Sequence, residues 1–240
     1  MPTNSMLLIR PDYELVTRYG ASWMTQVLNA ATIPVVDLHG PEATASNFFN
    51  ALETQDPLMV NILGHGNYNI IACQNNEILL QGGINTNVLA ERVVYDLSCR
   101  AGRDLGSTAF NEGATAFLGY TEDFWIIYSY GNNPDGGMVN PLLDEGARGF
   151  FESHNIAPIS YLQGSTVSAS YNASQSKSNY WISVWEEIDT QVAALLMWNR
   201  DYQVLYGEGS PIPGAGIGPA LIMLAPLLLI PMLSKKKKLK

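Results

Sequence analysis

The sequence predicts an α/β domain with a mostly parallel sheet that helices cover on both faces. Several short runs, among them residues 57–63 and 93–97, are predominantly apolar, which is typical of strands buried on both sides. Helical patterns separate these runs, and an alternation of strands with helices favours a parallel sheet. With 240 residues, of which 47% are hydrophobic and 15% charged, the chain can bury a full core as one domain.

The first half of the chain supplies most of the predicted sheet. A helix is expected over residues 11–30, because four apolar residues from Val16 to Val27 share one helical face and Asp12 is suited to cap its start. The other expected elements here are strands at 6–9, 33–38 and 114–120, helices at 44–52, 87–92 and 105–113, and a hairpin at 69–80.

The second half is predominantly helical. Helical patterns occupy most of residues 139–198, and "YQVLYGE" at residues 202–208 predicts a last strand that returns to the sheet. We therefore place a single globular domain at residues 1–206.

The C-terminal residues predict a membrane anchor. Residues 216–233 carry no charge and have no polar face, so they predict a transmembrane helix just long enough to cross the hydrocarbon core. A Gly/Pro-rich stalk at 207–215 would precede this helix, and a basic tail at 234–240 with five lysines would follow it. The alternative is a terminal helix buried in the core.

The body of the chain is acidic. Five of the 13 basic residues are the lysines of the tail, which leaves 8 basic against 22 acidic residues elsewhere, a balance of −14. Nucleic acid is excluded as a partner, because the body has no basic stripe to neutralise phosphates. The three histidines and two cysteines are scattered without ligand spacing, so no metal or other cofactor is expected.

The two ends of the chain favour different locations for the body. The basic tail favours a cytoplasmic C-terminus, which would display the body outside the cytoplasm. The N-terminal residues show no signal peptide, and this would fit a tail-anchored protein whose body is cytoplasmic. The polar, lysine-poor body favours the first arrangement.

Two residues with catalytic chemistry follow two apolar strands. His65 comes just after the strand at 57–63, and Cys99 just after the strand at 93–97. Ligands of parallel sheets bind beyond the carboxyl ends of the strands, so neighbouring strands would bring both side chains to one edge. The imidazole would take the thiol proton, and the backbone N–H groups of Gly66 and Cys99 would form an oxyanion hole. Each residue alone is more often structural, but their joint placement favours a catalytic pair.

These segments carry a family resemblance. "VNILGHGN" followed by "VVYDLSCRAGRDLGSTAFNEGATAFLGY" resembles the gingipain-like and CHAT-domain cysteine peptidases, which have the caspase-like fold. The resemblance covers roughly residues 6–208 and implies Cys99 as the nucleophile and His65 as the general base and acid. It also implies Gly66 and Cys99 as backbone oxyanion donors and a peptide or protein as the substrate.

The chain departs from the family at two places. The narrower caspase pattern Gln-Ala-Cys is replaced by "LSCRAG", so Arg100 does not indicate specificity for aspartate. After the last strand, Glu208 and Gly209 stand where gingipains usually have Asp-Pro.

The sequence therefore predicts a membrane-anchored cysteine endopeptidase with a Cys–His dyad. The rivals are a catalytically silent binding or scaffold module of the same fold displayed at a membrane, and a structural surface protein. The reactivity of Cys99 separates them. A catalytic thiol is expected to have a depressed pKa and to be alkylated faster than Cys73, the only other cysteine, whereas a structural thiol would be inert.

Four other features of the sequence are further candidates for functional residues. His39 also ends a predicted strand before a glycine, but that strand is expected further from Cys99, so a turn residue is expected. His154 is expected at a helix end. Residues 131–137 lack the carboxylate spacing of a calcium loop and predict a plain turn. The aromatic run at 122–130 follows a strand at the same sheet edge, which would let it border the cleft.

Overall fold

The computed structural model describes residues 2–128, 140–210 and 212. Its main sheet has six strands in the order β2-β1-β3-β7-β8-β9, all parallel except β9, which runs antiparallel to β8. The predicted mixed α/β class with a mostly parallel sheet is confirmed. The strands are β1 (Thr3–Arg10), β2 (Val35–His39), β3 (Pro57–Leu63), β7 (Val93–Leu97), β8 (Ala116–Tyr120) and β9 (Gln203–Gly207).

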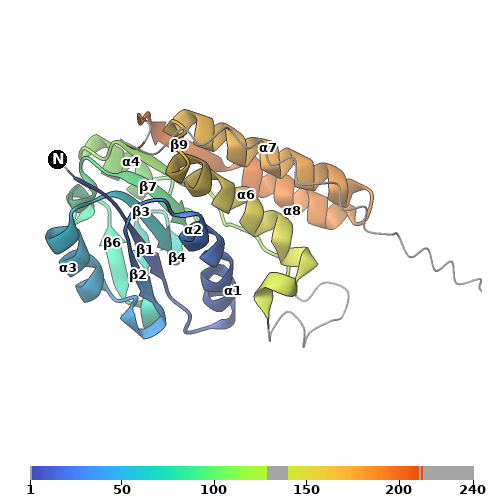
Figure 1. Ribbon diagram of the computed structural model, residues 1–240. Coiled ribbons are helices and arrows are strands. Elements are labelled where there is room, and N and C mark those ends of the chain that lie inside the picture. Colours follow the sequence, from blue (N-terminus) through green and yellow to red (C-terminus); the bar gives the residue numbers. More distant parts are fainter. Residues whose placement is uncertain (1, 129–139, 211, 213–240) are drawn as a thin grey trace, which may run out of the picture.

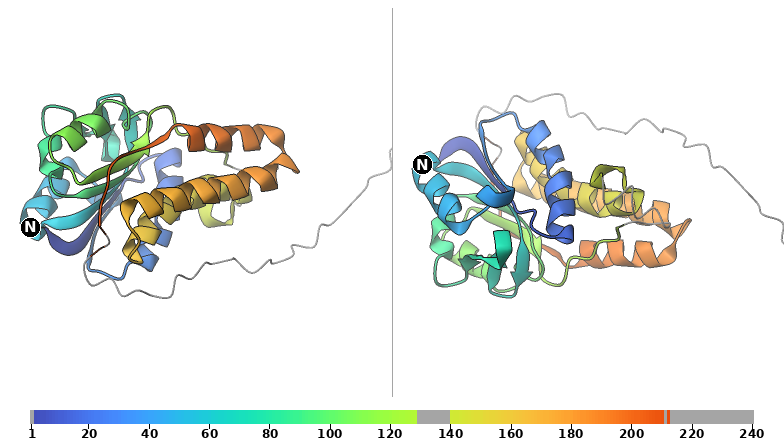
Figure 2. Two further views of the ribbon diagram at one scale, coloured as in Figure 1. Left: turned by 90° about the horizontal axis from the view of Figure 1, so that it is seen from above. Right: turned by 90° about the horizontal axis from the view of Figure 1, so that it is seen from below.

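Helices cover both faces of the sheet, which explains why its central strands are predominantly apolar (Figures 1 and 2). On one face, Tyr19, Trp23 and Phe151 pack against the sheet. On the other face, Phe48 and Leu105 do so, together with a small hairpin. The helices are α1 (Leu15–Trp23), α2 (Thr25–Ala30), α3 (Ala45–Gln55), α4 (Leu105–Asn111), α6 (Glu145–Leu162), α7 (Val167–Glu186) and α8 (Thr190–Asp201).

A three-stranded antiparallel sheet is inserted between β3 and β7. It consists of β4 (His65–Asn67), β5 (Ile70–Ala72) and β6 (Ile78–Gln81). The predicted hairpin is confirmed in β5 and β6, and β4 is an additional strand that begins at His65 itself. The insertion therefore holds His65 and Gly66 in hydrogen-bonded structure rather than in a free loop.

Helices α6, α7 and α8 pack together and extend beyond the end of the sheet (Figure 1). The expected helix end near His154 is wrong, because α6 begins after its capping residue Asp144 and continues through Pro158 to Leu162. His154 is consequently buried in mid-helix, where desolvation lowers its pKa to about 3 and keeps the imidazole neutral.

The last described residues pack on the domain. Gly207 ends β9, the carbonyl oxygen of Gly209 accepts a hydrogen bond from the N–H of Val167 at 3.1 Å, and Ile212 is buried. In the part of the chain that the structure describes, every helix is too short or too polar to cross a membrane. The predicted transmembrane helix at 216–233, the basic tail at 234–240 and the turn predicted at 131–137 lie outside the described residues.

Candidate active site

The structure brings His65 and Cys99 to the same edge of the main sheet. Strands β3 and β7 are parallel neighbours, with Leu63 opposite Leu97, and the N–H of Gly64 donates to the carbonyl oxygen of Leu97 at 3.3 Å. The next residues of each segment therefore emerge together, which confirms the placement predicted from the sequence.

His65 and Cys99 share a small, largely apolar cavity, which we call the apolar pocket. Its volume is about 50 Å³. Besides the two named side chains, the residues that line it are Val16, Thr17, Leu63, Gly64, Leu97, Phe124, Ile126 and Phe151. Within the described residues no hydrogen bond joins the sulfur of Cys99 to His65, so proton transfer between them requires an approach of the two groups during the reaction.

A carboxylate orients the imidazole. Nε2 of His65 lies 2.6 Å from Oε1 of Glu14, and both side chains are about two-fifths exposed. When Nε2 is protonated and donates a hydrogen bond to the Glu14 carboxylate, Nδ1 is the ring nitrogen left to act as a base. Glu14 thereby completes a thiol–imidazole–carboxylate arrangement.

Glu14 was missed by the sequence analysis, which placed the start of the first helix at Asp12. The structure instead begins α1 after Glu14, whose backbone N–H donates to Oγ1 of Thr17 at 3.3 Å. The expectation that Asp12 caps the first helix is wrong, because α1 begins at Leu15 and Glu14 is its N-terminal capping residue. An acidic residue just past a strand adjacent to β3 is the signal that could have found Glu14.

Gly66 packs directly on the backbone of Cys99. A Cβ atom at Gly66 would lie 2.0 Å from the carbonyl oxygen of Cys99 and 2.8 Å from its nitrogen, which no side chain could tolerate. The glycine therefore allows the two segments that carry the expected oxyanion donors to touch.

The electrostatics of Cys99 differ from the sequence-based expectation. Burial raises the pKa of its thiol, and the carboxylates of Asp123 and Asp96 raise it further, whereas the backbone N–H of Phe124 and the Arg100 guanidinium lower it. The expected depressed pKa is therefore wrong for this geometry. Cys99 holds its proton at neutral pH, so any nucleophilic role depends on a base that removes it.

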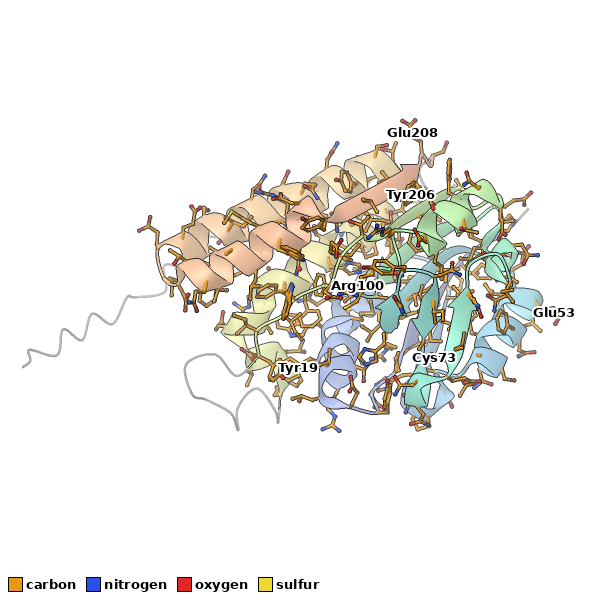
Figure 3. The ribbon with its side chains drawn as sticks, turned by 180° about the vertical axis from the view of Figure 1, so that it is seen from behind. Tyr19, Glu53, Cys73, Arg100, Tyr206 and Glu208 are labelled. Atoms are coloured by element: carbon orange, nitrogen blue, oxygen red, sulfur yellow. The ribbon has the colours of Figure 1, made fainter. Side chains whose placement is uncertain are left out.

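Cys73 is chemically distinct from Cys99. Both are free thiols, and Cys73 lies fully buried within the hairpin, between β5 and β6, away from Arg100, the residue that follows Cys99 (Figure 3). Burial and the nearby carboxylate of Glu77 raise the pKa of the Cys73 thiol to about 11. It provides an internal reference for the reactivity of Cys99.

The loop after β8 closes one side of the apolar pocket. The N–H of Arg100 donates to the carbonyl oxygen of Glu122 at 3.1 Å, and its guanidinium pairs with Asp123 at 2.6 Å. Arg100 adopts a left-handed backbone conformation with φ of 60°, which turns the chain sharply after Cys99. These contacts hold Phe124 and Ile126 against the pocket and confirm that the described part of the aromatic run borders the cleft.

A buried carboxyl group supports the segment that carries Cys99. Asp96 is fully buried in β7, its Oδ1 accepts a hydrogen bond from the Ser98 hydroxyl at 2.7 Å, and its Oδ2 has no hydrogen-bond partner among the described residues. Desolvation is the main reason that the pKa of Asp96 is raised to about 7.

His39, the other histidine that ends a predicted strand, is remote from Cys99. His39 ends β2, the edge strand, with β1 and β3 between it and β7. Its Nε2 lies 3.5 Å from Oδ2 of Asp12. Across the residues that the structure describes, no group of three or more histidine, cysteine or acidic side chains is placed to hold a metal ion.

Comparisons with known proteins return structural similarity only. No protein-family model matches the chain, and no curated protein sequence matches it. It is similar to the complex of the pro- and mature domains of RgpB from Porphyromonas gingivalis, at 10% identity and a TM-score of 0.48, over 87% of this chain and 48% of that chain. It is also similar to the Arg-specific cysteine proteinase gingipain R, at 13% identity and a TM-score of 0.48, over 87% of this chain and 47% of that chain. The chain thus spans about half the length of these structures.

Proposed function

We propose that this chain is a cysteine endopeptidase in which Cys99 and His65 form the catalytic dyad. The observation that carries the proposal is the meeting of both side chains in one pocket at the carboxyl ends of β7 and β3. A thiol beside an oriented imidazole is suited to acyl transfer. The resemblance of the two sequence segments to caspase-like peptidases supports a peptide bond as the acyl group.

The proposed reaction passes through an acyl-enzyme. Nδ1 of His65 takes the thiol proton while the sulfur of Cys99 attacks the carbonyl carbon of the substrate. The N–H groups of Gly66 and Cys99 stabilise the charge that develops on the carbonyl oxygen. The carbon–nitrogen bond then breaks, the leaving amine takes the proton from His65, and a thioester remains. Water gives a proton to His65, hydrolyses the thioester to a carboxylic acid, and the proton returns to the sulfur.

Glu14 acts in this scheme as a positioning residue. Its carboxylate accepts a hydrogen bond from Nε2–H of His65, with 2.6 Å between Nε2 and Oε1. This hydrogen bond selects the tautomer with a free Nδ1 and stabilises the imidazolium formed during the attack. It contacts neither the thiol nor the substrate, so its contribution is indirect.

Alkylation by iodoacetamide as a function of pH tests the dyad. Because burial raises the pKa of Cys99, an unassisted thiol would react only in alkaline solution. We expect Cys99 to react at pH 7 at least about 10-fold faster than Cys73, and His65→Ala to shift this reaction to higher pH. Glu14→Gln is expected to give a smaller shift in the same direction. Equal rates for the two cysteines, or a Cys99 profile that is unchanged in His65→Ala, would count against the proposal.

A second candidate function is a catalytically silent binding or scaffold module. It is favoured by one observation, that the described site holds a protonated Cys99 without a hydrogen bond to His65. The same labelling experiment separates the two candidates, because a silent module has no reason to keep a His65-dependent thiol reaction.

We further propose that residues 216–240 anchor the protein in a membrane with the body outside the cytoplasm. The uncharged run and the lysines that follow it support this proposal. Deletion of residues 216–240 is expected to move the protein from the membrane fraction to the soluble fraction without loss of folding, because it removes none of the described residues that pack on the domain. Aggregation of the truncated protein would indicate a core helix, and full-length protein that needs no detergent would contradict the anchor. Protease accessibility in intact cells then reports the side of the membrane.

A further inference from the structure

We propose that the apolar pocket receives a small aliphatic side chain of the substrate, so that the peptidase cleaves after alanine and valine. This inference rests on the proposed function and adds its substrate class. The side chain concerned belongs to the acyl residue, defined as the residue whose carbonyl carbon is attacked. When that carbon lies against the sulfur of Cys99, its Cα is one bond away, and its side chain enters the space beside the sulfur.

The position of the pocket follows from the two central strands. Leu63 and Leu97 stand two residues before His65 and Cys99 and lie opposite each other in the pairing of β3 with β7. Both are almost fully buried, at 5% and 4% exposure, and both line the pocket. The surface next to the dyad is therefore made of leucine methyl groups held by the rigid centre of the sheet.

The walls of the pocket carry no counter-charge for a charged substrate. Phe124, Ile126 and Phe151 complete the lining, and the Thr17 hydroxyl is already engaged with the backbone of Glu14, to whose carbonyl oxygen it donates at 3.2 Å.

Two acidic side chains near this lining are also engaged. Glu14 binds His65 and Asp123 binds Arg100, each at 2.6 Å. An arginine, lysine or aspartate side chain in the pocket would lose its hydration without gaining a partner, which is strongly unfavourable.

The volume limits the length of the side chain. A dry cavity of about 150 Å³ holds benzene, a molecule of six carbons, which corresponds to about 25 Å³ for each carbon. The space of about 50 Å³ beside Cys99 thus accommodates about two carbons, which lies between the single side-chain carbon of alanine and the three of valine. A phenylalanine side chain would require the wall to move.

The experiment uses the full-length protein in detergent and a set of peptides that differ only in the acyl residue. We expect kcat/KM for alanine and valine to exceed that for arginine, lysine and aspartate by at least about 100-fold, and that for phenylalanine by about 10-fold or more. Each rate is accepted only if it is lost in Cys99→Ala. Cleavage that is fastest after arginine, lysine or aspartate, and depends on Cys99, would overturn the pocket assignment while leaving the peptidase intact. The absence of Cys99-dependent cleavage for every peptide would overturn both.

A matched pair of variants locates the specificity. Ile126→Ala enlarges the pocket and is expected to raise the ratio of leucine to alanine cleavage by about 10-fold. Ile127→Ala is the control, since Ile127 packs against the same cluster of α6, α7 and α8 as Ile126 but is not among the residues that line the pocket. An equal change of the ratio in both variants would contradict the assignment. The peptide series with the unaltered protein decides the question even if a variant fails to fold.

Discussion

Replacement of Cys99 by alanine is expected to lower kcat/KM for peptide hydrolysis by about 10⁴-fold or more, because the nucleophile is lost. His65→Ala should have a comparable effect, since the thiol of Cys99 keeps its proton at neutral pH and needs a base. The two residues act as a unit, so the double variant should be scarcely slower than either single variant. Hydrolysis of a peptide chosen for the apolar pocket, measured at several pH values, supplies the rates.

Two substitutions serve as controls for this result. Cys73→Ala removes the other thiol, which is buried within the hairpin, and His39→Ala removes a histidine on the edge strand. Both variants should keep most of the activity. Substantial activity in Cys99→Ala would contradict the assignment of the nucleophile, and loss of activity in His39→Ala would mean that the wrong histidine had been chosen.

The second large effect concerns stability. Asp96→Asn is expected to increase the free energy of unfolding in neutral and alkaline solution. Burial raises the pKa of Asp96 to about 7 from an ordinary value of 3.8, so between these two values the folded state binds more protons than the unfolded state. Stability contributed by this group therefore falls as the pH rises from about 4 to about 7, by roughly 4 kcal/mol in total, and the full penalty remains at higher pH.

Asparagine cannot ionise and can still accept the hydrogen bond of Ser98. The difference in unfolding free energy between Asp96→Asn and the unaltered protein should consequently grow in favour of the variant between pH 4 and pH 8. Urea titrations at a series of pH values measure this difference. Glu53→Gln, at an exposed position on α3 (Figure 3), is the control for removing one carboxylate without burial. Stability curves that stay parallel for Asp96→Asn and the unaltered protein would contradict the prediction.

The parts of the fold that the sequence predicted well are those with a strong local signal. The bounds of β3 and β7 agree with the predicted apolar runs, because a strand buried on both faces consists mostly of apolar residues, with Asn61 and Asp96 as the single exceptions in β3 and β7. The helix ends were less predictable. Pro158 indicates a helix end in isolation, yet α6 continues through it because its packing against the sheet and α7 outweighs one missing backbone donor.

The residues of the candidate site also differ in how well the sequence alone identifies them. The sequence identified His65, Gly66 and Cys99, since each stands close to the end of an apolar strand. The chemistry of His65 and Cys99 lies in their side chains, and that of Gly66 lies in its having none. Glu14 could not be identified in this way, because its role depends on β1 lying beside β3, an adjacency between segments about fifty residues apart. Local patterns carry no information on the order of strands in a sheet.

The sequence by itself determined the α/β class, the two central strands and the residues with nucleophilic and basic chemistry that follow them. Only the tertiary structure decided the direction of the pKa shift at Cys99, because that shift comes from burial and from the carboxylates of Asp96 and Asp123. The apolar walls beside His65 and Cys99 were likewise decided by tertiary structure, since Phe124 and Phe151 reach the pocket from a loop and from α6. The physical reason is that desolvation and enclosure depend on groups distant in sequence, whereas strand formation and side-chain chemistry are encoded locally.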